Sequence, residues 1–295
     1  MAHLIGFQGL RGAYSELAIL QYFGKKMGAK VKPLPSFDAV FAELHSQKIS
    51  DALLPFENSL AGTVHDNYDL IARYQVMIMG ETILKIQHCL VGPVSLRLEQ
   101  VKTVISHPQA LAQCSGYLKD KKFAVQNYYD TAGAAMDLSQ KNLPNTAAVA
   151  SEQAARLYGL QVLARHIADR GENYTRFLHL KKRKNKPSGF PSPDRKGRVL
   201  SLLLVHSGAG FARIAPLCGI LQSLGIELVH CEARPTKDAA WTYNYYLEIA
   251  AGPDHPSWNT ALMTLRAMTR FLEVLGTYPS ERFSHHSASL AHQAL

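Results

Sequence analysis

The sequence predicts an α/β protein of two lobes, followed by a smaller α+β unit. From about residue 3 to residue 180, short apolar runs typical of strands alternate with helical patterns, which indicates right-handed βαβ units. A segment rich in lysine, arginine, proline and glycine, residues 181–198, then interrupts the alternation. Residues 199–280 follow with a strand, a helix, two strands, a helix and a last strand.

The first lobe is predicted over about residues 1–78 together with 165–180. A strand over residues 3–7 runs through glycines 6, 9 and 12 into a helix over 15–23. A glycine-rich turn before a helix exposes backbone N–H groups that bind anions. Because the spacing is not G-x-G-x-x-G, we expect a small carboxylate there rather than the pyrophosphate of a dinucleotide.

A loop over residues 56–64 is predicted to border a binding site. It follows a second helix, which starts at about Ser36, and a short strand over 51–55. Ligands of open α/β sheets gather in the loops after strands. Glu57, Asn58 and Ser59 offer a carboxylate, an amide and a hydroxyl in sequence.

The second lobe is predicted over about residues 79–164, and a β-like segment leads into it. Strands are expected over 101–105, 123–126 and 147–150, with helices that begin near residues 106, 130 and 151. The first of these helices is expected to continue through Gln113 and Leu118. Since Ser106 and Gln113 are seven residues apart, about two turns, they are predicted to share one helix face. Two lobes joined by crossing strands leave a cleft between them.

The chain then returns to the first lobe with the polar stretch Glu172–Phe177. Here the hydrogen-bonding side chains of Asn173 and Thr175 stand beside the cation of Arg176. An arginine grips a carboxylate through two parallel N–H bonds, and a hydroxyl one residue away could act on the far end of the same anion. The alternative is an ordinary strand entry whose polar side chains face water.

The last part of the chain predicts a separate unit. Strands over 199–205, 227–232, 241–249 and 274–278 with helices over 211–224 and 257–271 make a ferredoxin-like βαββαβ order. The tail, residues 281–295, lacks a core pattern. Residues 181–198 hold eight basic residues and one acidic one, which accounts for most of the formal net charge of +9. This indicates a solvated linker rather than a surface that binds nucleic acid.

Composition excludes several classes of protein. No apolar run is long enough to cross a bilayer, and the first residues lack the regions of a signal peptide, so we expect a cytoplasmic protein without a membrane partner. The four cysteines form no C-x-x-C pair, which is typical of reduced thiols. The histidines form no H-E-x-x-H motif and no cluster at ligand spacing. We therefore expect no metal and no cofactor.

Five motifs give the chain a family resemblance. They are GLRGAYS at 9–15, PFENSLAGTV at 55–64, SHPQALAQC at 106–114, DTA at 130–132 and NYTRF at 173–177. In this order and spacing they resemble the prephenate dehydratase family, which includes the arogenate dehydratases. The similarity spans about residues 3–280. It implies a catalytic part with a periplasmic-binding-protein-like two-lobed fold, and the C-terminal βαββαβ unit resembles an ACT domain.

The resemblance also implies a reaction and residue roles. Prephenate would lose carbon dioxide and water to give phenylpyruvate, a step of phenylalanine biosynthesis, without a cofactor. Thr175 would be the catalytic hydroxyl, and Asn58, Ser106 and Gln113 would hold the substrate and polarise its leaving hydroxyl. The residues implied in substrate binding are Ser15, Glu57, Ser59, Gly62, Thr131, Asn173, Arg176 and Phe177. Since the reaction expels hydroxide, the site needs a hydrogen-bond donor rather than a base.

The C-terminal unit departs from the family pattern for phenylalanine binding. The expected ESRP run survives as Glu232, Ala233, Arg234 and Pro235, with alanine in place of serine. The expected Gly-Ala-Leu turn is blurred over residues that include Gly210, Ala212 and Ile214. Arg213 beside these positions would crowd an amino-acid ligand. L-phenylalanine as an effector and a unit kept for subunit pairing, in a homodimer or homotetramer, therefore both remain open.

Two further alternatives remain open. The run at 9–15 is closer to the form found in arogenate dehydratases, so either prephenate or arogenate suits these motifs as substrate. The two-lobed fold also resembles solute-binding proteins, which admits a non-catalytic sensor of a small anion.

Overall fold

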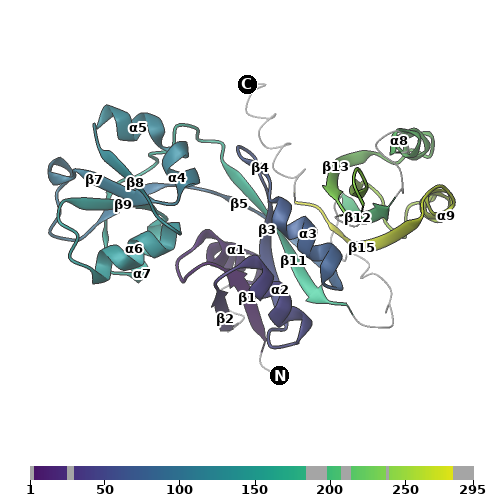
Figure 1. Cartoon of the computed structure of the whole chain (residues 1–295), viewed down its shortest axis with the longest axis horizontal. Helices are drawn as coiled ribbons and strands as arrows, with labels where there is room; N and C mark the ends of the chain where they lie inside the picture. The colour runs from purple at the N-terminus through teal and green to yellow at the C-terminus, as the bar shows by residue number, and fades with distance from the viewer. Residues whose placement is uncertain (1–2, 25–29, 184–197, 207–213, 237–238, 282–295) are drawn as a thin grey trace.

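Three sheets make up the described part of the protein. The computed structural model describes residues 3–24, 30–183, 198–206, 214–236 and 239–281. In Figure 1 the second lobe lies at the left, the first lobe in the middle and the C-terminal unit at the right. The predicted two-lobed α/β architecture with a separate α+β unit is confirmed.

The first lobe is built on a mixed sheet in the order β2-β1-β3-β11-β5, with β4 paired to β3. Strand β11 lies antiparallel between β3 and β5, so the returning chain sits in the middle of this sheet. The strands are β1 (Leu4–Gln8), β2 (Lys30–Leu34), β3 (Asp51–Asn58), β4 (Gly62–Thr63), β5 (Val76–Lys85) and β11 (Tyr174–Lys182). The helices are α1 (Tyr14–Phe23), α2 (Phe37–His45) and α3 (His65–Arg73).

The second lobe contains a smaller sheet in the order β10-β6-β9-β7-β8. Strand β7 is parallel to both of its neighbours, as expected for βαβ units. The strands are β6 (Cys89–Gly92), β7 (Thr103–Ser106), β8 (Ala124–Asn127), β9 (Thr146–Ala150) and β10 (Gln161–Ala164). The helices are α4 (Pro108–Gln113), α5 (Ser115–Asp120), α6 (Thr131–Gln140) and α7 (Glu152–Leu157), after the 3-10 turn η2 (Leu98–Gln100). Since β5 lies wholly in the first sheet, the second sheet begins later than residue 79.

Helix starts follow the expected capping chemistry in three places. The side chains of Ser36, Asp130 and Ser151 accept hydrogen bonds from backbone N–H groups in the first turns of α2, α6 and α7. The helix after β7 differs from the prediction. His107 caps it, and it is interrupted at Cys114 into two short helices, α4 and α5. The predicted loop after residue 55 also differs, because β3 continues to Asn58 and pairs there with β11.

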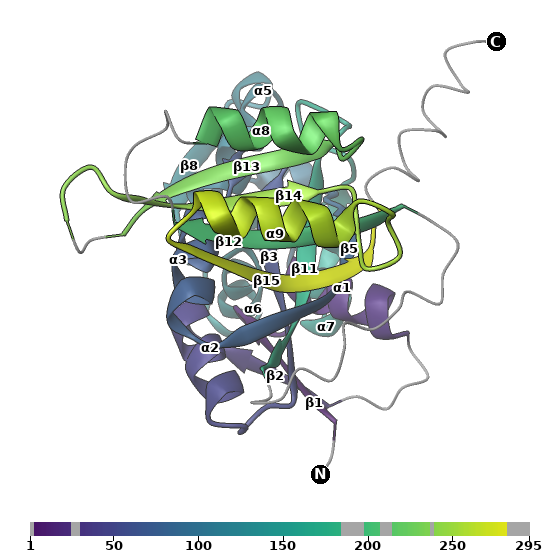
Figure 2. The same cartoon turned by 90° about the vertical axis from the view of Figure 1, so that its right-hand side faces the viewer.

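The C-terminal unit has the predicted ferredoxin-like order. Its sheet runs β13-β14-β12-β15, with helices α8 and α9 on its outer face (Figure 2). The elements are β12 (Val199–His206), α8 (Ile214–Ser223), β13 (Leu228–Pro235), β14 (Tyr243–Ile249), α9 (Trp258–Met268) and β15 (Phe271–Pro279). Helix α9 ends before the predicted residue 271, because Phe271 already pairs with His206 as the start of β15.

The inner face of the C-terminal sheet packs on the first lobe. Leu202, Tyr246 and Tyr278 belong to the same buried apolar cluster as Phe56 and Leu178 of the first sheet. The approach of β15 to β5 is close enough to require a glycine: a Cβ at Gly276 would lie 2.3 Å from the carbonyl oxygen of Ile78. The two units therefore share one core.

Some predictions concern residues that the structure does not describe. Gly210 and Ala212 of the blurred turn, most of the basic segment (184–197) and the tail (282–295) lie outside the described residues. Among the described residues, no helix combines the length and the apolar character needed to cross a membrane.

Candidate active site

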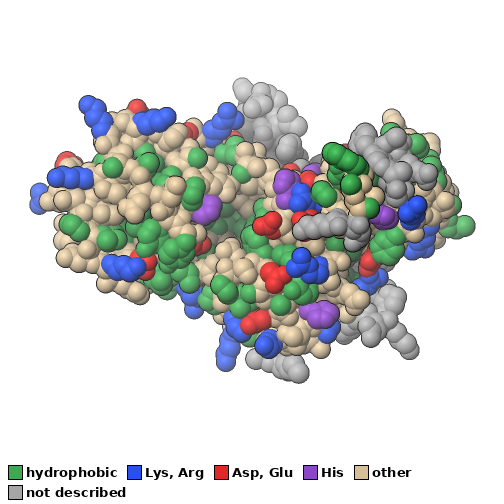
Figure 3. Space-filling view, viewed as in Figure 1, with side chains coloured by type: hydrophobic (Ala, Val, Ile, Leu, Met, Phe, Trp, Pro, Cys, Tyr) green, Lys and Arg blue, Asp and Glu red, His purple; other side chains and the backbone are tan. Residues whose placement is uncertain are grey.

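A cavity of about 760 Å³ lies where the two lobes face each other. The first lobe contributes residues from α1, α2, β3, α3 and β11, and the second lobe contributes residues from α4 and the start of α6. In the space-filling view, acidic side chains gather near the middle of the molecule, on the first-lobe side of this region (Figure 3). The predicted site residues that line the cavity are Ser15, Asn58, Gln113, Thr131, Thr175 and Phe177.

The glycine-rich turn brings the N-terminus of α1 to the cavity. Gly12 has a φ of +84°, and a Cβ there would lie 3.0 Å from Ala154 Cα of the second lobe, so only glycine fits this contact. The buried carboxylate of Glu16 accepts the Gly12 N–H at 2.6 Å, and Ser151 Oγ donates to the Gly12 carbonyl at 3.0 Å. The turn thus fixes the first turn of α1, with Tyr14 and Ser15, at the edge of the cavity.

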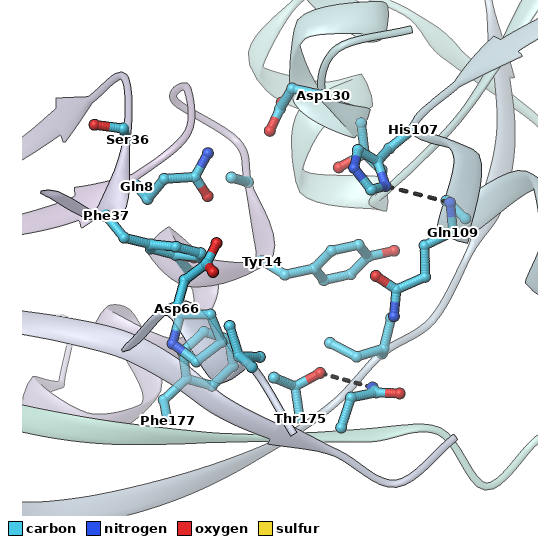
Figure 4. A pocket seen from close by; sticks show the side chains of 18 of the residues that line it. Gln8, Tyr14, Ser36, Phe37, Asp66, His107, Gln109, Asp130, Thr175 and Phe177 are labelled. Atoms are coloured by element: carbon cyan, nitrogen blue, oxygen red, sulfur yellow. Dashed lines mark hydrogen bonds between the residues drawn. The ribbon is translucent and has the colours of Figure 1, made fainter. Parts of the chain in front are cut away.

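Thr175 projects into the cavity from the end of β11 that faces the second lobe. Asn58 is its partner in the neighbouring strand β3, and Asn58 Nδ2 donates to Thr175 Oγ1 at 3.0 Å (Figure 4). Among the described residues, the Thr175 hydroxyl makes no other hydrogen bond. Because the oxygen accepts there, the hydroxyl proton is left to be donated to another group.

A chain of polar side chains continues from this pair into the second lobe. Asn58 Nδ2 also donates to Asn173 Oδ1 at 2.8 Å, and Asn173 Nδ2 donates to Gln113 Oε1 at 3.0 Å. His88 Nε2 lies 2.8 Å from the same Gln113 oxygen, and the Tyr14 hydroxyl lies 2.9 Å from His88 Nδ1. Asn173 is fully buried. It therefore does not reach the cavity, and it holds the side chains of Asn58 and Gln113 through hydrogen bonds.

Tyr14 and His88 line the cavity but were missed as functional residues by the sequence analysis. Tyr14 lies inside the glycine-rich motif, and this position could have marked it as a candidate site residue. In Figure 4 its side chain extends across the middle of the cavity. His88 lies between β5 and β6 in a stretch that reads only as strand-forming. Burial lowers the pKa of His88 below its ordinary value, with the hydrogen bond to Gln113 acting in the opposite direction.

Besides Asn173 and Arg176, four predicted substrate-site residues do not line the cavity. Ser106 ends strand β7, is fully buried and donates to the carbonyl of Val149 at 2.7 Å, so it shares no helix face with Gln113. Ser59 Oγ accepts the N–H of Tyr174 at 2.9 Å and ties β3 to β11. Gly62, with a φ of +82°, serves the turn into β4. The Glu57 carboxylate lies 3.9 Å from Arg176, on the side away from Thr175.

The prediction that Arg176 binds a substrate carboxylate needs correction. Adjacent residues of a strand point to opposite faces, so when Thr175 faces the cavity Arg176 faces the C-terminal unit. Its guanidinium is 4% exposed and ion-paired with two buried carboxylates, Glu81 of β5 at 2.6 Å and Glu248 of β14. It also donates to the Tyr278 hydroxyl at 3.0 Å. Its hydrogen-bonding capacity is therefore used at the interface between the units.

The described residues predicted to bind an effector do not line the cavity. Arg234 of β13 donates two hydrogen bonds to Asp69 of α3, at 2.8 and 3.0 Å, and Glu232 lies 3.4 Å from His65 at the start of α3. Ala233 and Pro235 are exposed. Ile214 is fully buried in the core between the C-terminal sheet and its helices, so the prediction that it contacts a ligand is not supported by its position.

Comparison with known proteins identifies the family. A sequence profile described as prephenate dehydratase matches residues 5–185. The chain belongs to the prephenate dehydratase family. Its reaction class is therefore that of a carbon–oxygen lyase, and the residues that the profile matches include both lobes.

Some relatives within this family are named as arogenate dehydratases and others as prephenate dehydratases. The chain is 36% identical to arogenate dehydratase 2 of Petunia hybrida, over 94% of this chain and 72% of that protein. It is 32% identical to the bifunctional chorismate mutase/prephenate dehydratase of Escherichia coli, over 94% of this chain and 71% of that protein. A prephenate dehydratase of Arthrobacter aurescens, solved in complex with L-Phe, has the same fold with a TM-score of 0.83, 23% identity and 99% coverage of both chains.

Proposed function

We propose that the protein converts prephenate to phenylpyruvate, carbon dioxide and water in the cavity between its two lobes. The observation that supports this most directly is the hydrogen bond from Asn58 to Thr175 Oγ1, which leaves the hydroxyl proton for a leaving group. Figure 4 shows Thr175 at the bottom of the view, with His107 of the second lobe at the top.

The chemistry of prephenate requires a donor of this kind. The ring carboxylate leaves as carbon dioxide, and its bonding electron pair enters the ring while the bond from carbon to the hydroxyl breaks. The departing hydroxide takes up one proton and becomes water, so the site must stabilise negative charge on that oxygen. Thr175 donates to the oxygen as the bond breaks, and its own proton is replaced from water. Since threonine is a weak acid, positioning of the substrate supplies much of the acceleration.

Two helix N-termini support the binding of an anionic substrate. The first turns of α1, with Ser15, and α6, with Thr131, line the cavity from opposite lobes. Free backbone N–H groups and the helix dipole favour a negative charge at such positions. The Arg73 side chain, also at the cavity, is ion-paired with Asp38 at 3.1 Å. We infer that hydroxyl and backbone donors, rather than a free arginine, hold the substrate carboxylates.

The direct test incubates the purified protein with prephenate and, separately, with arogenate. Phenylpyruvate and phenylalanine are quantified as products, with Thr175→Ala as the control for contaminating activity. We expect phenylpyruvate from prephenate and a large loss with the variant. The absence of product from both substrates would support the sensor of a small anion instead.

Arogenate is a second candidate substrate, because it carries an ammonium group where prephenate has a keto oxygen. Asp66, in the first turn of α3, lines the cavity (Figure 4). A carboxylate there would favour an ammonium group. Faster formation of phenylalanine from arogenate than of phenylpyruvate from prephenate would assign this substrate.

We further propose that the C-terminal unit is an ACT domain that binds L-phenylalanine. Its β13 residues Glu232 and Arg234 contact α3, and Asp69 of α3 also lines the cavity, so a ligand near β13 would act on the catalytic part through this helix. Isothermal titration with L-phenylalanine is expected to show saturable binding and lowered turnover. No heat of binding at millimolar phenylalanine would leave subunit pairing, in a homodimer or homotetramer, as the role of the unit.

A further inference from the structure

The direction of each hydrogen bond in the polar chain can be deduced from one fixed end. Asn58 Oδ1 accepts from the backbone N–H groups of Leu60 and Ala61, at 3.0 and 2.8 Å. A backbone N–H can only donate, so these two bonds identify the oxygen of the Asn58 amide without ambiguity. The nitrogen of the same amide must then be the atom that faces Asn173 and Thr175.

The same logic orients the next two amides. Since Asn58 donates, the Asn173 atom 2.8 Å away is an acceptor oxygen, and the other end of Asn173 is its nitrogen. That nitrogen donates to Gln113 at 3.0 Å, so the Gln113 atom in the chain is the oxygen. The Gln113 nitrogen is thereby left with two N–H groups, and because Gln113 lines the cavity we infer that they can be donated to a substrate.

His88 is the last fixed partner of Gln113. Because Gln113 Oε1 is an acceptor, His88 Nε2 at 2.8 Å must carry a proton and donate it. The neutral ring then has a bare Nδ1. The Tyr14 hydroxyl lies 2.9 Å from this nitrogen and 2.9 Å from the backbone carbonyl oxygen of Gln87, so its one proton is shared between two acceptors. Burial favours this neutral state, since it lowers the pKa of His88 and raises the pKa of Tyr14 well above its ordinary value. The neighbouring thiols are neutral as well, because burial raises the pKa of Cys89 and raises that of Cys114 to about 12.

We propose that His88 is a positioning residue of the dehydratase site: its Nε2–H holds the Gln113 oxygen, so that the Gln113 N–H2 group is presented to the substrate. This proposal rests on the proposed function. Without the His88 donor, Asn173 would be the one side chain of the described residues that holds the Gln113 amide, which would lose its fixed orientation at the cavity. An ordinary core histidine, by contrast, would matter for folding and not for the orientation of an amide.

The first test compares two substitutions with prephenate, or with arogenate if that is the substrate turned over. His88→Gln places an amide N–H2 near the position of Nε2 and keeps a donor for Gln113, whereas His88→Phe fills the space without one. We expect His88→Phe to lower kcat by roughly 10- to 100-fold, the cost of a misoriented polar group. His88→Gln is expected to restore kcat to within about 3-fold of the unmodified protein. Circular dichroism and thermal unfolding confirm that both variants are folded.

A double-mutant cycle with Gln113→Ala separates positioning from a merely structural role. If His88 acts through Gln113, His88→Phe has at most about a 2-fold further effect on kcat in the Gln113→Ala background. The same loss in both backgrounds would overturn the proposal, as would unchanged kcat in folded His88→Phe.

The tautomer supplies a readout that needs no turnover. In protein with ¹⁵N-labelled imidazoles, the His88 resonances, assigned with His88→Gln, should show a protonated Nε2 and a bare Nδ1 at neutral pH. A protonated Nδ1 with a bare Nε2 would contradict the proposal, whether or not either substrate is converted. Failure of the proposed function is separate, because it would show as no product from the unmodified protein.

Discussion

Thr175→Val is expected to lower kcat for dehydration by at least about 100-fold, the typical cost of removing one donor to a developing oxyanion. Valine has the shape of threonine, so the packing of β11 against β3 is retained while the hydroxyl is lost. The Michaelis constant should change little, because the hydroxyl acts most strongly as the bond to the leaving oxygen breaks. Steady-state kinetics with prephenate and arogenate measure both constants.

The controls for this prediction separate the hydroxyl from the fold. Thr175→Ser keeps a hydroxyl at the same place and should retain much of the activity. Thr103→Val makes the same chemical change on strand β7, away from the cavity, and should leave kcat unchanged. Near-normal turnover by Thr175→Val would exclude Thr175 as the donor to the leaving group.

The order of strands and helices could be read from the sequence because it follows local patterns. Alternating apolar runs, capping residues such as Asp130 and Ser151, and the basic segment after residue 180 are each visible within a few residues. Ser106 was placed on the wrong element because a serine before His107 and Pro108 looks like a helix cap. The structure instead ends β7 at Ser106 and gives the cap to His107.

The partners of the site residues were not predictable from local patterns. His88 meets Gln113 across 25 positions, and Arg176 meets Glu248 across 72. Thr175 and Arg176 were predicted to act on one substrate, although neighbours in a strand face opposite ways. One strand, β11, therefore carries the candidate catalytic hydroxyl on one face and the contact with the C-terminal unit on the other.

Arg176→Met is expected to destabilise the protein by about 3–5 kcal/mol, the cost of removing one member of a buried ion-pair network. The substitution leaves Glu81 and Glu248, which are 2% and 0% exposed, close together without the cation between them. Burial by itself lowers the pKa of Arg176, but the carboxylates of Glu248 and Glu81 outweigh it and hold that pKa well above the ordinary value. Urea denaturation followed by fluorescence and circular dichroism measures the change.

Arg73→Met is the matched control, because it removes an arginine from a pair with Asp38 whose side chains are 59% and 55% exposed. An exposed pair contributes at most about 1 kcal/mol, so this variant should unfold at nearly the same urea concentration as the unmodified protein. The two roles considered for Arg176 give opposite results. If the side chain gripped a substrate carboxylate, Arg176→Met would raise the Michaelis constant and leave the free energy of unfolding unchanged. A large loss of stability, in contrast, places the function of Arg176 at the junction between the catalytic sheet and the C-terminal unit, where it fixes the strand that carries Thr175.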